Sequence, residues 1–414
     1  MVGLVFLCII LCAETYIFIV KTRFPALSNN YPRVIRFSLL VFFIMMLGVN
    51  AFSWGFRYYP IIVLYVCLIA LNEWRIFRSQ SKHKHTRRGI ITLLFIATAF
   101  LPSVLFPLSQ PLKPTGILTV KTTRLFFTDT SRIELYSDKG GARAFSARVW
   151  YPESTDELYP LILYSHGGIS LDTSNESLFI ELASHGYVVL SVAHDYHSIV
   201  TTNEHGKNRW INSGYLNELN REDAKKDPEN SVALYHEWMQ YRSADLVYIM
   251  DSLTQDNEVM ARIDTTRIGV VGHSLGGSVA LCMGRSQSRV KVVIALESPF
   301  MCDITGVDEG GFVFDETEYP TPVLNIYSDS AFAHLGSWPQ YKANYRLLST
   351  TNPSNHFLHI EGTHHFSLTD LSLTSPLLAR ILNGEKSSRD AQETLQIINS
   401  VSLEFLNNYL KQGE

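Results

Sequence analysis

Gly272-His273-Ser274-Leu275-Gly276-Gly277 is the stretch of this sequence that decides the fold. It has the G-x-S-x-G form of a nucleophile elbow, in which a strand turns sharply into a helix and leaves a serine exposed at the turn. The segment 267–271 before it is short and apolar like a buried strand, and 278–283 after it is typical of a helix. The motif therefore stands in the context it requires, which predicts a serine hydrolase with Ser274 as nucleophile.

Apolar runs of strand length continue on both sides of this motif. They fall at 117–121, 124–128, 145–151, 160–165, 187–193, 267–271, 291–296, 322–327 and 356–360. Helical patterns separate the later runs, which predicts a mostly parallel sheet with helices on both faces, whereas the first strands should be antiparallel. The predicted fold class is an α/β-hydrolase domain over 117–414. Arg242 and Asp245 are expected to pair on its long helix at 231–254.

The first 106 residues contain further apolar runs at about 2–20, 37–54, 58–74 and 89–106. Each run is just long enough to span a bilayer, so the sequence predicts an all-α module of four transmembrane helices over 1–106. A proline-rich linker at 107–116 would join it to the hydrolase domain. Glu14 lies inside the first run without an obvious basic partner, and we assign it no role.

The charges between these runs predict an orientation. Basic residues without acids follow the first run, and a second basic group follows the third run; they are Lys21, Arg23, Arg33 and Arg36, then Arg75, Arg78, Lys82, Lys84, Arg87 and Arg88. By the positive-inside rule both groups should be cytoplasmic. The sequence therefore predicts an integral protein of the cell membrane whose catalytic domain is extracytoplasmic. The net charge of −4 gives no sign of a nucleic-acid partner.

A serine hydroxyl needs a histidine base and an acid that orients it, and in this fold the chain order is Ser, acid, His. His365 is the favoured base because it stands in the loop after the last predicted strand, with His364 as second choice. Glu297 and Asp329 each end an earlier strand, so both could reach the imidazole at the carboxyl edge of the sheet. The residues alone leave the acid open.

The negative charge that develops on a substrate carbonyl oxygen needs two backbone N–H donors. Leu275, the residue after the nucleophile, is expected to supply one, and Gly168 in the His166-Gly167-Gly168 turn the other. We expect no cofactor and no metal, because the five cysteines fit no metal motif. The polar excursion at 198–230 could be a lid over the pocket or a solvated loop, and the sequence does not decide between them.

Three stretches, 263–277, 165–167 and 180–192, together resemble the platelet-activating-factor acetylhydrolase family over about 145–411. The resemblance implies a metal- and calcium-independent esterase that removes short acyl groups, with phospholipids carrying a short or oxidised chain among its substrates. It also favours Glu297 as acid and His365 as base. Glutamate stands where the family pattern usually has aspartate, which keeps Asp329 as the alternative. The N-terminal module lies outside the resemblance.

The leading prediction is a membrane-anchored serine carboxylic ester hydrolase, acetylhydrolase- or lipase-like, that forms an acyl-enzyme on Ser274. Its partners would be an ester or lipid substrate and the membrane. One alternative is a catalytically silent membrane sensor or assembly protein with the same fold. Another is a peptidase or a dienelactone-type hydrolase, but the former usually has a propeller or cap domain and the latter has cysteine at the nucleophile position.

Overall fold

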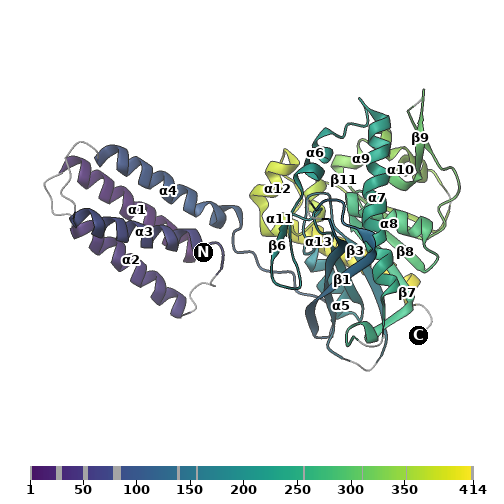
Figure 1. The fold of residues 1–414 in the computed structure, drawn as a ribbon, viewed down its shortest axis with the longest axis horizontal. Helices are drawn as coiled ribbons and strands as arrows, with labels where there is room; N and C mark the ends of the chain where they lie inside the picture. Colours follow the sequence, from purple (N-terminus) through teal and green to yellow (C-terminus); the bar gives the residue numbers. More distant parts are fainter. Residues whose placement is uncertain are drawn as a thin grey trace. The chain divides into compact units, whose positions relative to one another are not determined.

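The computed structural model describes residues 2–24, 30–49, 55–77, 85–137, 140–154, 157–254, 257–309, 311–350 and 352–411 (Figure 1). The chain divides into two compact units. The first comprises Met1–Leu108 with Thr374–Leu377, and the second comprises Ser109–Leu373 with Leu378–Glu414.

The first unit is built from four helices that overlap the four apolar runs. They are α1 (Val2–Arg23), α2 (Asn30–Gly48), α3 (Tyr59–Phe77) and α4 (His85–Leu105). The second helix, α2, begins seven residues before its run and ends six residues before the run does. Ile10, Phe43, Tyr65 and Ile96, one from each helix, are buried together in their common core. This unit therefore has a hydrophobic core of its own.

The prediction of four membrane spans is not supported. In the part of the chain that the structure describes, no helix combines the length and the apolar character that crossing a bilayer demands. Arg33 and Arg36, which were assigned to a loop, lie in the first two turns of α2 and make that helix less apolar than the run alone suggested. Arg78, Lys82 and Lys84 lie outside the described residues.

Glu14 has the basic partner that the sequence did not reveal. The guanidinium of Arg36 donates from Nε and Nη2 to the two carboxylate oxygens of Glu14, each at 2.8 Å. Both side chains are buried, so the two charges compensate each other between α1 and α2. The pair accounts for Glu14 as a packing residue of this unit.

The second unit is organised around an eight-stranded sheet in the order β1-β2-β4-β3-β7-β8-β11-β12. Its strands are β1 (Val120–Ile133), β2 (Ala142–Pro152), β3 (Tyr159–Ser165), β4 (Val188–Ala193), β7 (Ile263–His273), β8 (Val290–Leu296), β11 (Val323–Ser328) and β12 (Asn355–Ile360). As predicted, the first strands pair antiparallel, since β2 runs antiparallel to both of its neighbours, β1 and β4. All pairs from β4 to β12 are parallel. The runs at 117–121 and 124–128, predicted as two strands, are one long strand.

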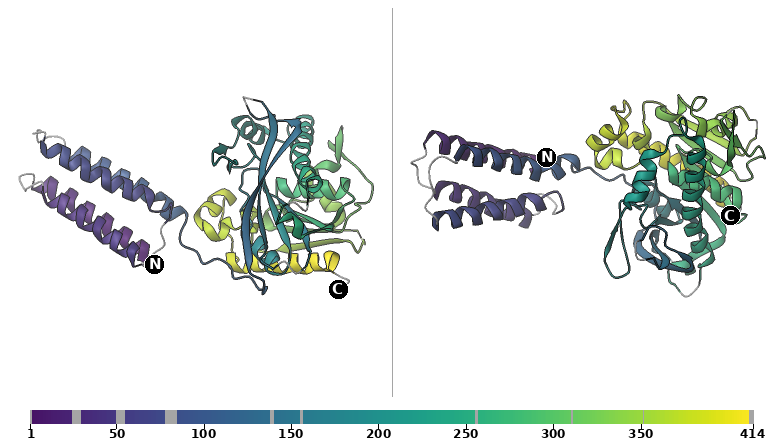
Figure 2. Two further views of the ribbon diagram at one scale, coloured as in Figure 1. Left: turned by 60° about the horizontal axis from the view of Figure 1, so that its bottom comes forward. Right: turned by 45° about the horizontal axis from the view of Figure 1, so that its top comes forward.

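Helices cover both faces of this sheet, as Figure 2 shows from two further sides. On β3, Leu161 and Leu163 pack into one core with α7 (Pro228–Asp251) and α8 (Leu275–Ser286). Ile162 and Tyr164 pack into a second core with α5 (Glu176–Ser184) and α13 (Ala391–Leu410). This alternation follows from the two-residue period of a strand and gives the α/β-hydrolase architecture that the sequence predicted.

Two features fix α8 against its neighbours. A Cβ at Gly276 would lie 2.0 Å from the Ser165 carbonyl oxygen, so only glycine lets α8 pass this close to β3. At the other end of the helix, Cys282 forms a disulfide with Cys302 in the 3₁₀ helix η3 (Met301–Asp303), which the cysteine spacing had not indicated. The N-terminal turn of α8 is thereby held close to the sheet.

Candidate active site

Ser274 stands alone between the end of β7 and the start of α8, as the elbow motif requires. Its backbone has φ 54° and ψ −126°, a combination that costs a non-glycine residue on the order of 1–3 kcal/mol. Its N–H donates to the Leu296 carbonyl oxygen at 2.8 Å, which ties the turn to β8. The side chain is half-buried, so the hydroxyl stays accessible.

His365 and Glu297 are in direct contact. His365 begins the short helix η5 (His365–Leu368), and its Nδ1 lies 2.7 Å from Glu297 Oε1. Glu297 follows β8 with φ 51° and is only 2% exposed. Its second oxygen accepts from the Ser328 N–H at 2.8 Å and from the Ser328 hydroxyl. The carboxylate therefore has fixed partners on both oxygens, and one of them is the imidazole.

The environment of Glu297 favours its ionised form. Burial by itself would raise the pKa of this carboxyl, but the hydrogen bonds from His365 and Ser328 outweigh burial and hold the pKa below its usual range. A carboxylate at this position keeps Nδ1 of the imidazole protonated, which leaves Nε2 as the nitrogen that can accept a proton.

Asp329, the alternative acid, contacts a different histidine. Its Oδ1 lies 2.7 Å from His359 Nε2, and its Oδ2 accepts from the Gly362 N–H at 2.8 Å. His364, the alternative base, has Nδ1 3.2 Å from the Ser330 hydroxyl, and its N–H donates to Ser367. The structure thus brings together Glu297 and His365, and it places Asp329 and His364 in other contacts.

One cavity of about 350 Å³ contains the predicted reacting groups. Ser274, His365 and Glu297 line it together with Leu275 and Gly168, the two predicted oxyanion donors. Its other walls are largely apolar and include Leu219, Trp238, Met301, Trp338 and Tyr341. A smaller cavity of about 110 Å³ beside Phe126, Phe145 and Arg209 contains none of the predicted groups.

Part of the polar excursion contributes to this cavity. The excursion folds into a hairpin, β5 (Val200–Thr202) and β6 (Asn208–Trp210), followed by α6 (Ser213–Arg221). Leu219 of α6 and Glu222 after it line the cavity. The sequence had not decided between a lid and a solvated loop, and the structure makes this end of the excursion a wall of the cavity.

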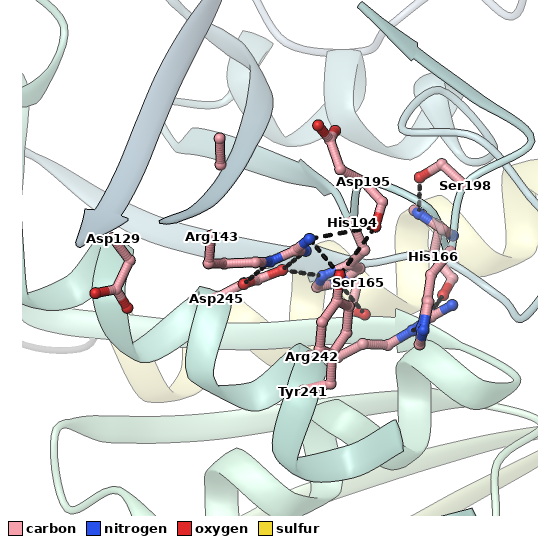
Figure 3. Close-up of polar contacts among 12 residues, drawn as sticks. Asp129, Arg143, Ser165, His166, His194, Asp195, Ser198, Tyr241, Arg242 and Asp245 are labelled. Carbon is pink, nitrogen blue, oxygen red and sulfur yellow. Dashed lines mark hydrogen bonds and ion pairs between the residues drawn. The ribbon is translucent and has the colours of Figure 1, made fainter. Parts of the chain in front are cut away.

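The predicted pairing of Arg242 with Asp245 is wrong. Asp245 accepts two hydrogen bonds from Arg143, and its Oδ2 lies 2.9 Å from His194 Nδ1; these three side chains are buried (Figure 3). Arg132 donates a further hydrogen bond to Asp245 at 2.8 Å. Arg242 turns toward the backbone of the loop after β3. The spacing of three residues on α7 allowed the pair, but each side chain has other partners from distant segments of the chain.

These contacts form a second Ser-His-Asp hydrogen-bond network, which was not predicted from the sequence. The Ser165 hydroxyl lies 2.9 Å from His194 Nε2, and His194 Nδ1 lies 2.9 Å from Asp245 (Figure 3). Burial lowers the pKa of His194 to about 4, so the imidazole is neutral at pH 7. None of the three side chains is exposed. This hydrogen-bond network therefore stabilises the end of β3 and is no second reaction centre.

The comparisons with known proteins agree with this fold. The family model described as platelet-activating factor acetylhydrolase, isoform II, matches residues 139–414. The chain belongs to this family. Within the described residues, no group of three His, Cys, Asp or Glu side chains is arranged to hold a metal ion.

Two curated relatives of this acetylhydrolase-family chain are distant in sequence. The platelet-activating factor acetylhydrolase of Cavia porcellus is 25% identical over 271 residues, which cover 63% of this chain and 59% of the relative. That of Gallus gallus is 25% identical over 276 residues, covering 61% and 63%. The chain thus spans less than two thirds of the length of these relatives. A ferulic acid esterase structure from Streptomyces cinnamoneus shares the fold, with TM-score 0.55, 21% identity and coverage of 72% and 92%.

Proposed function

We propose that this chain is a serine carboxylic ester hydrolase that forms an acyl-enzyme on Ser274. The observation that carries the proposal is the contact between Glu297 and His365 in the same cavity as the elbow serine. Family membership and the names of the curated relatives support ester hydrolysis as the reaction. The remaining support is the strained, accessible conformation of Ser274, which is typical of a nucleophile.

The proposed reaction has two steps. The Ser274 hydroxyl attacks the ester carbonyl carbon while His365 Nε2 takes its proton, and Glu297 stabilises the imidazolium that forms. The N–H groups of Leu275 and Gly168 donate to the oxyanion of the tetrahedral intermediate. His365 then gives its proton to the leaving alcohol, and water removes the acyl group by the same sequence of proton transfers.

The first test is hydrolysis of p-nitrophenyl acetate by the full chain and by Ser274→Ala. The wild type should hydrolyse this ester, and Ser274→Ala should abolish the reaction. A fluorophosphonate probe should label the wild type alone. A chain that neither hydrolyses the ester nor reacts with the probe would instead be the catalytically silent sensor or assembly protein.

We propose short-acyl esters, phospholipids among them, as the substrate class. The family name and the mostly apolar cavity walls support this choice, since an apolar wall binds the hydrocarbon part of an ester. A hydrolysis profile over lipid extracts with acetyl, short and long acyl chains tests it. Preference for long chains, or cleavage of a peptide amide at a comparable rate, would contradict it.

We propose that the hydrolase unit works in an extracytoplasmic compartment. The support is the Cys282–Cys302 disulfide, because disulfides persist in oxidising compartments and are rare in the cytosol. Protease treatment of intact cells should degrade this unit, while a cytosolic marker survives. Full protection of the hydrolase unit would contradict the proposal.

A further inference from the structure

Arg242 is a buried cation that faces the loop expected to bind the oxyanion. It lies on α7 and is 0% exposed. Its Nη1 donates to the His166 carbonyl oxygen at 2.6 Å, and Nη2 donates to that of Gly167 at 3.3 Å and reaches that of Gly168 at 3.5 Å. One guanidinium therefore draws three successive carbonyl groups toward α7.

Tyr215 of α6 strengthens this arrangement. Its hydroxyl donates to the Gly168 carbonyl oxygen at 3.0 Å and accepts from Arg242 Nη2 at 3.0 Å. The ring of His197 stacks on Tyr215 with centroids 3.6 Å apart, and its Nδ1 accepts from Arg242 Nε at 3.2 Å. Burial and the charge of Arg242 hold the pKa of His197 well below its usual value, so this acceptor stays neutral.

The partners of Arg242 distinguish it from the other buried cation nearby. Arg143 is paired with the carboxylate of Asp245 (Figure 3) and with that of Glu134. The contacts of Arg242 within the described chain are carbonyl groups, a phenol and an imidazole. Burying a cation without an anion is costly, and here the carbonyl dipoles of a single loop offset the loss of hydration.

The direction of these carbonyls determines where the N–H groups of the loop point. In a trans peptide unit the C=O and the next N–H point in opposite directions. Since the Gly167 carbonyl points to Arg242, the Gly168 N–H points away from α7. The loop also lies against the nucleophile, because a Cβ at Gly167 would come 3.6 Å from Ser274 Cβ. Gly168 itself lines the cavity with Ser274 and Leu275.

We propose that Arg242 is a positioning residue that aims the Gly168 N–H at the oxyanion of the reaction on Ser274. The inference rests on the proposed ester hydrolysis and adds a residue that neither contacts substrate nor belongs to the triad. The Ser165–His194–Asp245 network fixes the start of the loop after β3, and Arg242 orients the peptide planes of that loop (Figure 3). Because the oxyanion exists only after attack, Arg242 acts on the transition state more than on substrate binding.

The test compares Arg242→Met with Arg262→Met in the full chain. Arg262 is also buried, and its Nη1 donates to the successive carbonyls of Pro152, Glu153 and Ser154 at 3.0, 2.9 and 3.0 Å. It precedes β7, whereas Ser274 follows that strand, so the length of the strand puts Arg262 roughly 30 Å from Ser274. Arg262→Met therefore removes the same kind of buried contact without touching the site.

With p-nitrophenyl acetate, Arg242→Met should lower kcat by about 10- to 100-fold and leave KM nearly unchanged. Its affinity for a trifluoromethyl ketone, which forms a tetrahedral oxyanion on the serine, should fall in parallel with kcat/KM. Arg262→Met should lower the melting temperature and keep kcat. Arg242→Lys keeps the positive charge but lacks the several N–H donors of the planar guanidinium. Its kcat should therefore lie between those of Arg242→Met and the wild type.

Tyr215→Phe provides a gentler variant if Arg242→Met does not fold. It removes one donor to Gly168 and should lower kcat several-fold with KM unchanged. If wild type is active, Ser274→Ala is inactive, and both Tyr215→Phe and any folded Arg242 variant keep wild-type kcat and ketone affinity, the inference is wrong and the proposed function stands. Inactive wild type would instead overturn the proposed function itself.

Discussion

At the scale of single residues, the choice of acid is the point at which the sequence was least decisive. Glu297 and Asp329 both end parallel strands, and each contacts a histidine in the structure. Only the histidine bound by Glu297 lines the cavity with Ser274. The glutamate side chain is one methylene longer than aspartate, and from a backbone with φ 51° it reaches the imidazole of His365. This geometry argues for Glu297 as the residue that orients the base.

The two acids can be separated by isosteric variants. Glu297→Gln should lower kcat by on the order of 10³-fold or more, because an amide does not stabilise the imidazolium and selects the wrong tautomer. Asp329→Asn should stay within a few-fold of wild type. The measurement is kcat and KM on p-nitrophenyl acetate, with melting temperatures as the check on folding. The reverse ranking would make Asp329 the triad acid.

Residue types and order predicted Ser274, His365 and the two candidate acids, because each belongs to a local pattern of strand and turn. The role of Arg242 was beyond reach of the same reasoning. Its carbonyl partners lie 74 to 76 residues away in the chain, and a helical spacing of three suggested Asp245 instead. The disulfide was missed for a similar reason, since a sequence separation of 20 between two cysteines matches no recognisable motif.

At the scale of elements, the site depends on how closely α8 passes the sheet. The helix crosses β3 at Gly276, and Gly277 packs against the loop after β8, where a Cβ would lie 1.9 Å from the Ser298 hydroxyl oxygen. These contacts bring Ser274 and Leu275 beside the loop that contains Gly168. The elbow motif therefore encodes a packing distance between two elements as well as a turn.

Gly276→Ala should displace α8 from β3, because the added Cβ would meet the Ser165 carbonyl, which is backbone and cannot rotate away. We expect a loss of about 1–3 kcal/mol in the free energy of unfolding and a large loss of kcat. Gly306→Ala is the matched control, since nothing lies within 4 Å of its Cβ position. Equal stability and activity of the two variants would refute this account.

The disulfide joins the other end of α8 to the segment that bears Met301, a wall of the cavity. Replacing both cysteines, Cys282→Ala with Cys302→Ala, should lower the free energy of unfolding by about 3 kcal/mol in the loop-entropy description. Urea denaturation of the oxidised wild type and the double variant measures this difference. The wild type treated with reductant should match the double variant, and an unchanged midpoint in both cases would contradict the prediction.

At the scale of the whole molecule, the sequence predicted the α/β-hydrolase class correctly, because buried parallel strands and amphipathic helices differ in period. It predicted the N-terminal region less well. Apolar runs are compatible with a membrane span or with a helix packed on other helices, and hydropathy does not show a buried ion pair such as Glu14–Arg36. The four helices were predicted, whereas the ion pair between the first two of them was not.

The stability of the hydrolase unit should depend on pH through its buried histidines. Burial keeps the pKa of each well below the unfolded value, to about 4 for His194 and about 3 for His273; the others are His166 and His197. Between pH 6.5 and about 4 the unfolded chain therefore binds more protons than the folded chain. The free energy of unfolding should fall as pH falls, by up to about 1.4 kcal/mol per pH unit for each histidine.

Three aspartates oppose this trend. Burial raises the pKa of Asp370 to about 6 and also raises those of Asp195 and Asp303, so the folded chain retains protons there that the unfolded chain releases. Because four histidines oppose three aspartates, we expect the free energy of unfolding to be lower at pH 5 than at pH 7. Urea denaturation at pH 7 and pH 5, with calorimetric proton uptake on unfolding, tests the balance. Equal or higher stability at pH 5 would show that the histidines do not dominate.

The left-handed backbone at Ser274 implies a conflict between reactivity and thermal robustness. Glycine tolerates this conformation, but alanine has a Cβ and keeps the strain. Ser274→Gly should therefore be inactive and also more stable than Ser274→Ala, by on the order of 1 kcal/mol. Such a variant would bind intact ester without hydrolysing it. It is therefore the preferred form for calorimetric titration and for crystals with bound substrate.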